Sequence, residues 1–405
     1  MFKKIKHQFR LQTLKKKLQS QKRFLDSSVW SKSGPSILII DGNIPEYNKD
    51  SGSRRLLELM KILLKEGYNV YLMADLKEYK YKSDYISFYK NMGVHVYEPS
   101  LDAQGELITR NAFLTLLAPH LDVVWLHRPE TFNTYYKLVK SITEKALLVY
   151  DMVDFHYLRN LREWELNKEE KLKVKAEKYL KLELENCQNA DKIVVISDKD
   201  KVALSEYYKD TSKMVTLGNV HEFLPKGKDF VPFAERSELL FVGGFGHKPN
   251  IDAVIWLNQE IMPIVWESLP DLKINIVGSH PPQDLLDLNS EKFKVIGFVD
   301  DISSYYKTAK LFVAPLRFGA GVKGKIGQSF EYSLPVITTD VGAEGFNFSP
   351  FKQDMVGNSA AHIAQLIIQI VIEEGLWTNI SAKSEQFIAP YSLKTIETQL
   401  KTIVS

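Results

Sequence analysis

The chain has 405 residues, a formal net charge of +3, 44% hydrophobic residues and 25% charged residues. This length suits two domains better than one core, and so small a net charge argues against a nucleic-acid-binding protein. The single cysteine, Cys187, excludes an internal disulfide and a cysteine-rich metal site. No apolar run reaches the roughly 18–20 residues of a membrane-spanning helix, and no signal-peptide pattern opens the chain, so we expect a cytoplasmic protein.

Residues 1–25 are strongly basic, with nine lysines and arginines and no acidic residue before Asp26. Their apolar residues recur at steps of three and four, which predicts a basic amphipathic helix within residues 1–33. Such a helix can lie on an anionic membrane surface, here the inner face of the plasma membrane. The alternative is a solvated helix that packs on the protein's own surface.

The next part of the chain alternates apolar strands with amphipathic helices. A strand at Ile37–Ile40, a polar loop, a helix from about Arg54 to Glu66 and a strand at Asn69–Met73 form a βαβ unit. A long charged stretch from about Leu161 to Asn186 lacks glycine and proline and predicts one helix. These features predict a Rossmann-like domain at 34–222, with further strands at 94–97, 123–126, 147–150 and 193–196.

A segment with Pro225, Gly227 and Pro232 predicts a linker at 223–237. A second series follows, with a helix at 251–269 and strands at 239–242, 273–277, 293–296, 311–314 and 335–338. It predicts a second Rossmann-like domain at 238–380 and a C-terminal helix at 381–405, for which packing back on the N-terminal domain is one arrangement. The fold class is therefore α/β, with two domains facing a central cleft where ligands meet the carboxyl ends of the strands.

The most informative loop runs from Pro315 to Gln328, between a buried strand and a helix. Its glycines allow the backbone to approach a ligand closely, and the helix start offers free N–H groups to a diphosphate. Lys323 and Lys325 add positive charge, and Arg317 is placed to grip a phosphate. We interpret the loop as a phosphate site; the alternative is a mobile loop with surface lysines.

A second glycine-rich loop at 243–250 occupies the first strand-to-helix turn of the same domain. Gly244, His247 and Lys248 precede Pro249, a residue typical of the first helical turn. Neither loop carries the Gly-Lys-Ser/Thr of a Walker motif or a well-placed GxGxxG, which argues against ATP-hydrolysing and hydride-transferring enzymes.

Several segments together resemble GT-B glycosyltransferases, and most closely the bacterial members of glycosyltransferase family four that build surface polysaccharides. In the second half the resemblance is carried by residues 239–253, 297–301, 314–325 and 338–345, and in the first half by residues 50–54 and 150–159. It extends from about Ser36 to Phe346 and leaves the basic N-terminal segment outside.

The resemblance implies a metal-independent hexosyl- or deoxyhexosyltransferase. Its substrate would be a nucleotide-diphosphate sugar and its acceptor a growing cell-surface glycan, such as an O-antigen or capsule, free or lipid-linked. No cofactor is implied, because the nucleotide sugar is a substrate, and no nucleic acid takes part. Two alternatives are a nucleotide-sugar epimerase and a non-catalytic nucleotide-binding partner of a glycosyltransferase.

The resemblance also implies a set of donor-binding residues: Gly52, Gly244, His247, Lys248, Phe298, Val299, Arg317, Gly321, Val322, Lys323, Lys325 and Gln328. Relatives have two glutamates eight positions apart in this region, and the corresponding residues here are Ala320 and Gln328. Gln328 can still bond ribose hydroxyls, whereas Ala320 cannot contact the sugar electrostatically. This departure leaves the donor sugar and the retaining or inverting outcome open.

Asp154 and His156 follow a strand and are candidate general bases for the acceptor hydroxyl. Arg54 and Arg159 are candidate acceptor-binding residues. The alternative is that Asp154 caps the following helix and His156 packs. We interpret Asp300–Asp301 as a helix cap rather than a metal ligand pair, so no metal site is expected.

Overall fold

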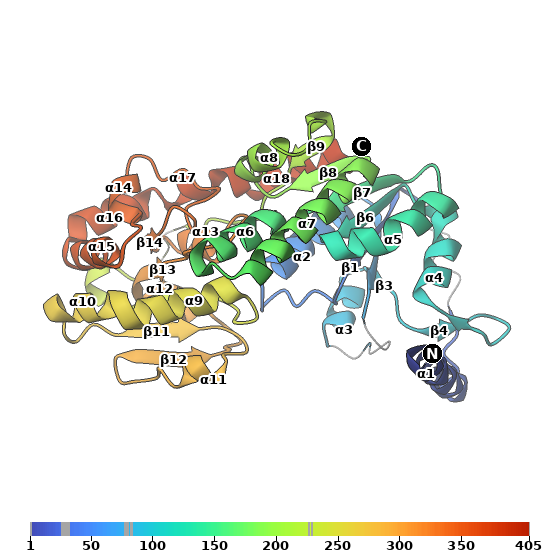
Figure 1. The fold of residues 1–405 in the computed structure, drawn as a ribbon, viewed down its shortest axis with the longest axis horizontal. Helices are drawn as coiled ribbons and strands as arrows, with labels where there is room; N and C mark the ends of the chain where they lie inside the picture. The colour runs from blue at the N-terminus through green and yellow to red at the C-terminus, as the bar shows by residue number, and fades with distance from the viewer. Residues whose placement is uncertain are drawn as a thin grey trace.

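The computed structural model describes residues 2–25, 33–76, 81, 84–225, 227 and 230–404. Two parallel sheets lie side by side and helices pack around both of them (Figure 1). The first sheet has the strand order β3-β2-β1-β6-β7-β8-β9, and the second has the order β12-β11-β10-β13-β14. The α/β class with two Rossmann-like domains is therefore confirmed.

The first sheet is entirely parallel, and its inner strands are buried apolar runs. Side chains of β1 alternate between two apolar clusters, with Ile37 and Ile39 in one and Leu38 and Ile40 in the other. Sequence reasoning missed β9 and a short antiparallel hairpin, β4–β5. The strands are β1 Ser36–Asp41, β2 Asn69–Ala74, β3 His95–Val96, β4 Ser100–Leu101, β5 Leu107–Ile108, β6 Val123–His127, β7 Leu147–Asp151, β8 Lys192–Val195 and β9 Met214–Thr216.

The helices of this domain include one correction. The single helix expected at 161–186 is two helices that pack against each other, α6 and α7. Lys168 ends α6 with a left-handed conformation, φ 57°, which reverses the chain without a glycine. The helices are α2 Ser51–Lys65, α3 Asp84–Asn91, α4 Arg110–Leu117, α5 Pro129–Ile142, α6 His156–Asn167, α7 Glu170–Asn189 and α8 Asp198–Ser205.

The second domain follows the predicted alternation. The helix expected at 251–269 begins three residues earlier and passes through a π-helical turn, Leu257–Ile261, that joins α9 to α10. The strands are β10 Ser237–Val242, β11 Ile274–Val277, β12 Phe293–Gly297, β13 Ala309–Ala314 and β14 Val336–Thr338. The helices are α9 Lys248–Trp256, α10 Met262–Ser268, α11 Gln283–Leu286, α12 Ser303–Thr308, α13 Gly324–Glu331, α14 Lys352–Met355, α15 Ala360–Ile372, α16 Glu374–Ala382 and α17 Ser384–Ile388.

The last helix, α18 Leu393–Val404, returns to the first domain (Figure 1). Ile396, Leu400 and Ile403 are buried in the same apolar cluster as Ile37 and Ile39. An ion pair between Lys65 and Glu397, with Nζ 2.6 Å from Oε1, joins α2 to this helix at the surface. The chain therefore connects its two domains twice.

The N-terminal helix, α1 Phe2–Ser20, lies against the β4–β5 hairpin (Figure 1). Leu18 is buried, the Lys15 ammonium lies 2.6 Å from the Glu106 carboxylate, and Phe24 bridges to Leu101. Phe9 is 70% exposed. The C-terminal half of α1 thus packs on the protein's own surface, while its amphipathic character stays a prediction, and residues 26–32 of the predicted segment lie outside the described residues. Among the helices that the structure describes, none combines the length and apolar character needed to span a membrane.

A buried arginine holds the first domain together at its carboxyl edge. Arg55 donates from Nη1 to Asp151 at 2.7 Å, and from Nε and Nη2 to the carbonyl oxygens of Gly218 and Leu217. Trp125 donates to the same Asp151 oxygen at 3.0 Å. Arg55 therefore ties α2 to β7 and to the segment that leads into the second domain.

Replacing Arg55 by methionine should lower the free energy of unfolding by about 3–5 kcal/mol, because Asp151 would remain buried without its counter-ion. Urea denaturation measures the change. Lys65→Met, which removes an exposed ion pair from the same helix, should cost much less than Arg55→Met, because solvent screens that pair. Equal losses in the two variants would contradict the structural role of Arg55.

Candidate active site

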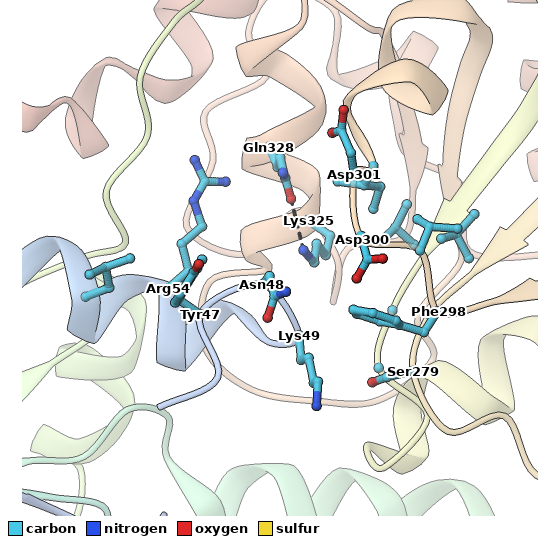
Figure 2. A pocket seen from close by; sticks show the side chains of 18 of the residues that line it. Tyr47, Asn48, Lys49, Arg54, Ser279, Phe298, Asp300, Asp301, Lys325 and Gln328 are labelled. Atoms are coloured by element: carbon cyan, nitrogen blue, oxygen red, sulfur yellow. Dashed lines mark hydrogen bonds between the residues drawn. The ribbon is translucent and has the colours of Figure 1, made fainter. Parts of the chain in front are cut away.

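A cavity of about 350 Å³ lies between the two domains. One wall comes from the segment before α2 and from α2 itself, and the other comes from loops at the carboxyl ends of the second sheet's strands (Figure 2). Predicted residues that line it are Arg54, Gly244, Phe298, Val299, Lys325 and Gln328. Tyr47, Asn48, Lys49 and Ser279 also line it and were not predicted. The position agrees with the rule that such sheets bind ligands beyond their strand ends.

The glycine-rich loop after β13 touches the first domain. Gly321 has φ 72°, and a Cβ placed on it would lie 3.0 Å from the Cβ of Asp154. A Cβ on Gly324, the first residue of α13, would lie 2.6 Å from Ser51. Side chains at these positions would push the domains apart, so the glycines permit the contact that brings the start of α13 to the cleft.

Both predicted phosphate lysines lie on this loop, and each is paired within the protein. Lys323 donates to the Gly321 carbonyl at 2.5 Å and lies 3.6 Å from Glu344. Lys325 donates to the Gln328 side chain at 3.0 Å, as Figure 2 shows. Burial, and after it the neighbouring Arg54, lowers the pKa of Lys325 to about 8. The loop thus places two cations at the start of a helix, as the sequence predicted.

The structure places Arg317 differently from the prediction. Its guanidinium donates to both carboxylate oxygens of Asp252, at 2.9 and 2.5 Å, and lies over the Trp256 ring. Arg317 is not among the residues that line the cavity. Because Asp252 on α9 already supplies the planar, two-point partner that an arginine prefers, the geometry does not support the predicted phosphate grip.

The basic residues of the second glycine-rich loop, His247 and Lys248, do not add free positive charge to the cavity. Lys248 donates to Glu163 on α6 at 2.7 Å, which is a contact between the two domains. Burial, together with Arg159 and Lys323, lowers the pKa of His247, so this imidazole is neutral at pH 7. His247 is therefore a neutral hydrogen-bonding group, and not a cation, beside Asp154, His156 and Arg159.

Asp154, His156 and Arg159 meet on the side of the first domain that faces Gly321. Asp154 accepts from Arg159 at 2.5 Å, and its carboxylate lies 2.9 Å from Nδ1 of His156. Burial opposes the ionisation of Asp154, but Arg159 and His156 outweigh it and hold the pKa of Asp154 well below its usual range. Burial lowers the pKa of His156, but the neighbouring Asp154 carboxylate has the opposite and larger effect, so the pKa of His156 is raised. A carboxylate whose pKa is held well below its usual range by Arg159 and His156 is a poor general base.

The helix cap near this cluster comes from a residue that the sequence did not single out. Glu183, on α7, accepts from the backbone N–H groups of His156 and Tyr157, both at 2.9 Å, at the start of α6. The His156 ring stacks on Tyr179 with 5.3 Å between ring centroids. His156 therefore packs as the alternative interpretation proposed, whereas the cap is Glu183 and not Asp154.

Two other predicted residues, Gly52 and Val322, are not among the residues that line the cavity. A Cβ on Gly52 would lie 3.5 Å from Nη2 of Arg128, and the carbonyl of Val322 accepts from Asn219. Asp301 accepts from the N–H and the hydroxyl of Ser303, the first residue of α12, but the N-cap position is Ile302, one residue after the predicted one. Within the described part of the chain, no group of three or more His, Cys, Asp and Glu side chains could hold a metal ion.

Sequence reasoning missed a two-point ion pair between the domains. Arg162, on α6, donates to both oxygens of Glu344 at 2.9 and 2.6 Å, and to the carbonyl of Gly319 at 2.7 Å. Arg162 and Glu344 are 182 positions apart, so no local pattern could pair them.

The sequence profile described as Glycosyl transferases group 1 matches residues 236–371, which is most of the second domain. A curated relative, the uncharacterized 44.6 kDa protein in the cps region of Klebsiella pneumoniae, is 26% identical over 143 residues. That match covers 32% of this chain and 36% of the relative, so it spans little more than a third of the relative's length.

Solved structures resemble nearly the whole chain. HepE of Anabaena in complex with UDP and glucose has a TM-score of 0.65 at 13% identity, covering 91% of this chain and 99% of that one. The pneumococcal O-GlcNAc transferase GtfA in complex with UDP and GlcNAc has a TM-score of 0.68 at 13% identity, covering 92% and 99%. WaaG, a glycosyltransferase involved in lipopolysaccharide biosynthesis, has a TM-score of 0.61 at 13% identity, covering 92% and 100%. The two domains thus share a GT-B-like fold with these proteins, and residues 236–371 match the profile of the group 1 glycosyl transferases.

Proposed function

We propose that the protein is a glycosyltransferase that moves a sugar from a nucleotide-diphosphate sugar to a growing cell-surface glycan. The observation that carries the proposal is the cavity between the domains, where the start of α13 and Lys325 meet the wall formed by α2. The UDP complexes of similarly folded proteins support a nucleotide-sugar donor. The relative from a cps region supports a capsule or related surface glycan as the product.

The chemistry requires stabilisation of a leaving group. When the sugar–phosphate bond breaks, negative charge collects on the departing nucleoside diphosphate. The free N–H groups at the start of α13 and the ammonium groups of Lys323 and Lys325 can meet that charge. The Phe298 ring, 42% exposed at the cavity wall, offers a face on which a nucleobase can stack.

The proton of the acceptor hydroxyl needs a destination. Asp154 is held by Arg159 and His156, so it is a poor acceptor of that proton. The leaving phosphate oxygen, which gains charge as its bond to the sugar breaks, is a better base at that moment. In this scheme the acceptor oxygen forms a bond to the anomeric carbon, the phosphate oxygen leaves with the bonding electrons, and the acceptor proton passes to that phosphate.

Replacing both Lys323 and Lys325 by alanine should weaken UDP binding by roughly 1.5–3 kcal/mol for each ammonium group removed, because two charge-assisted hydrogen bonds to the diphosphate disappear. Calorimetry with UDP, alongside thermal unfolding to verify the fold, measures the effect. Arg317→Ala is the matched control, because this guanidinium is bound to Asp252 and should not matter for UDP. Unchanged affinity in the lysine variant would show that the donor site lies elsewhere.

UDP affinity should be constant at neutral pH and fall as the pH rises through about 8, by up to tenfold per pH unit. The sign follows from Lys325: its pKa is lowered in the free protein, so above about pH 8 it is neutral and offers no charge to the diphosphate. The ligand does not lose charge over this range, because its last phosphate proton dissociates near pH 6. Affinity that does not change from pH 7 to pH 10 would contradict the role of Lys325.

An acceptor carried on a membrane lipid would account for the basic N-terminal helix. Lys16 and Lys17 are exposed on α1, and each lysine near an anionic surface contributes about 1 kcal/mol. Lys16→Glu with Lys17→Glu should therefore reduce binding to phosphatidylglycerol vesicles by about 30-fold or more at low salt. The control is the double variant Lys178→Glu with Lys181→Glu, which changes two exposed lysines of α7. Equal vesicle binding by the two double variants would refute a membrane role for α1.

A further inference from the structure

Glu331, in the last turn of α13, is bound by side chains from two other parts of the chain. Its carboxylate accepts from Nη2 of Arg54 on α2, with 3.0 Å to Oε1 and 2.9 Å to Oε2. His221 belongs to the segment between β9 and β10, and its Nδ1 lies 2.6 Å from Oε1 of Glu331. The Glu331 side chain is only 5% exposed. The buried carboxylate of Glu331 thus joins α13 to the first domain and to the segment that connects the two domains.

The face of α13 around Glu331 is shaped for His221. A Cβ on Gly327 would lie 2.2 Å from Nε2 of His221, so this ring fits against the helix only because residue 327 is glycine. Among the described residues Nε2 of His221 has no hydrogen-bond partner, and the His221 backbone N–H donates to Tyr391 at 2.8 Å. Gly327 and Glu331 are one helical turn apart and therefore share a face. The imidazole ring of His221 therefore packs against Gly327 and contacts the carboxylate of Glu331.

Arg54 also lines the donor cavity, together with Lys325 (Figure 2). The charged groups that face Lys325 are Arg54, Asp50 and Glu331. Those that face Glu331 are Arg54, His221 and Lys325, with the hydroxyls of Tyr306 and Tyr332 nearby. Two cations therefore stand close together at the cavity, and Glu331 is the carboxylate that neutralises Arg54. Without it, the charge of Arg54 would disfavour the charged form of Lys325.

We propose that Glu331 is a positioning residue of the donor site: it fastens α13 to α2 and to the interdomain segment, and it cancels the charge of Arg54 beside Lys325. This inference rests on the proposed function, in which Lys325 meets the diphosphate of the donor. Glu331 does not touch the donor itself. It acts through Arg54 and through the placement of α13.

The experiment measures UDP affinity from pH 6.5 to pH 10 in the full-length protein. Glu331→Gln should move the pH midpoint of binding downward by about one unit, because Arg54 is left uncompensated beside Lys325. Arg54→Gln should move the midpoint upward, because it removes the cation and leaves Glu331. The double variant should return the midpoint close to that of the wild type. A role confined to stability would not move the two single variants in opposite directions.

Lys65→Gln and Glu397→Gln are the matched controls, because they break an exposed ion pair on the same helix α2 and should leave the midpoint unchanged. If Glu331→Gln alone does not fold, the double variant compared with Arg54→Gln tests the proposal, because removal of Glu331 should lower the midpoint in that background as well. Midpoints that match the wild type in both single variants would overturn the role of Glu331 alone. A wild-type protein that binds no UDP at any pH would instead overturn the proposed donor site.

Discussion

The contact between the glycine-rich loop and the first domain is the constraint on which the rest of the site depends. Gly321 and Gly324 bring the loop within van der Waals distance of Asp154 and Ser51, where no side chain would fit. That approach closes the cleft around the start of α13, and it lets Lys325 and Arg54 line one cavity. Electrostatic interactions between such groups are stronger near a protein surface than in bulk water. The two glycines therefore allow the two domains to meet.

The charges around the cleft are arranged for a ligand of the opposite sign. Lys323 is close to Glu344, and Lys325 is hydrogen-bonded to Gln328. These are weaker partners than a diphosphate, which offers two negative groups to the same cations. Arg162 and Glu344 form a two-point pair across the cleft, so the protein holds the domains together with contacts beside the phosphate loop.

The parts of this account that the sequence predicted are local ones. Buried parallel strands such as Ile37–Ile40 are continuous apolar runs, and the phosphate loop shows its glycines and lysines within fourteen consecutive positions. The parts that were missed depend on partners distant in sequence: Arg54 and Glu331 are 277 positions apart, and Arg317 and Asp252 are 65 apart. A residue type indicates what a side chain can bind, but the fold determines which partner lies within hydrogen-bonding distance. The break between α6 and α7 was missed because Lys168 takes a left-handed conformation without glycine.

The central claim is that a nucleotide-sugar donor binds between the domains, with its diphosphate at the start of α13. A crystal structure of the protein with UDP-glucose tests this claim most directly. We expect diphosphate oxygens within hydrogen-bonding distance of the Lys323 and Lys325 ammonium groups, and a nucleobase against Phe298. Electron density for the nucleotide outside the cavity between the domains, with both lysines still bound to Gly321 and Gln328, would contradict it.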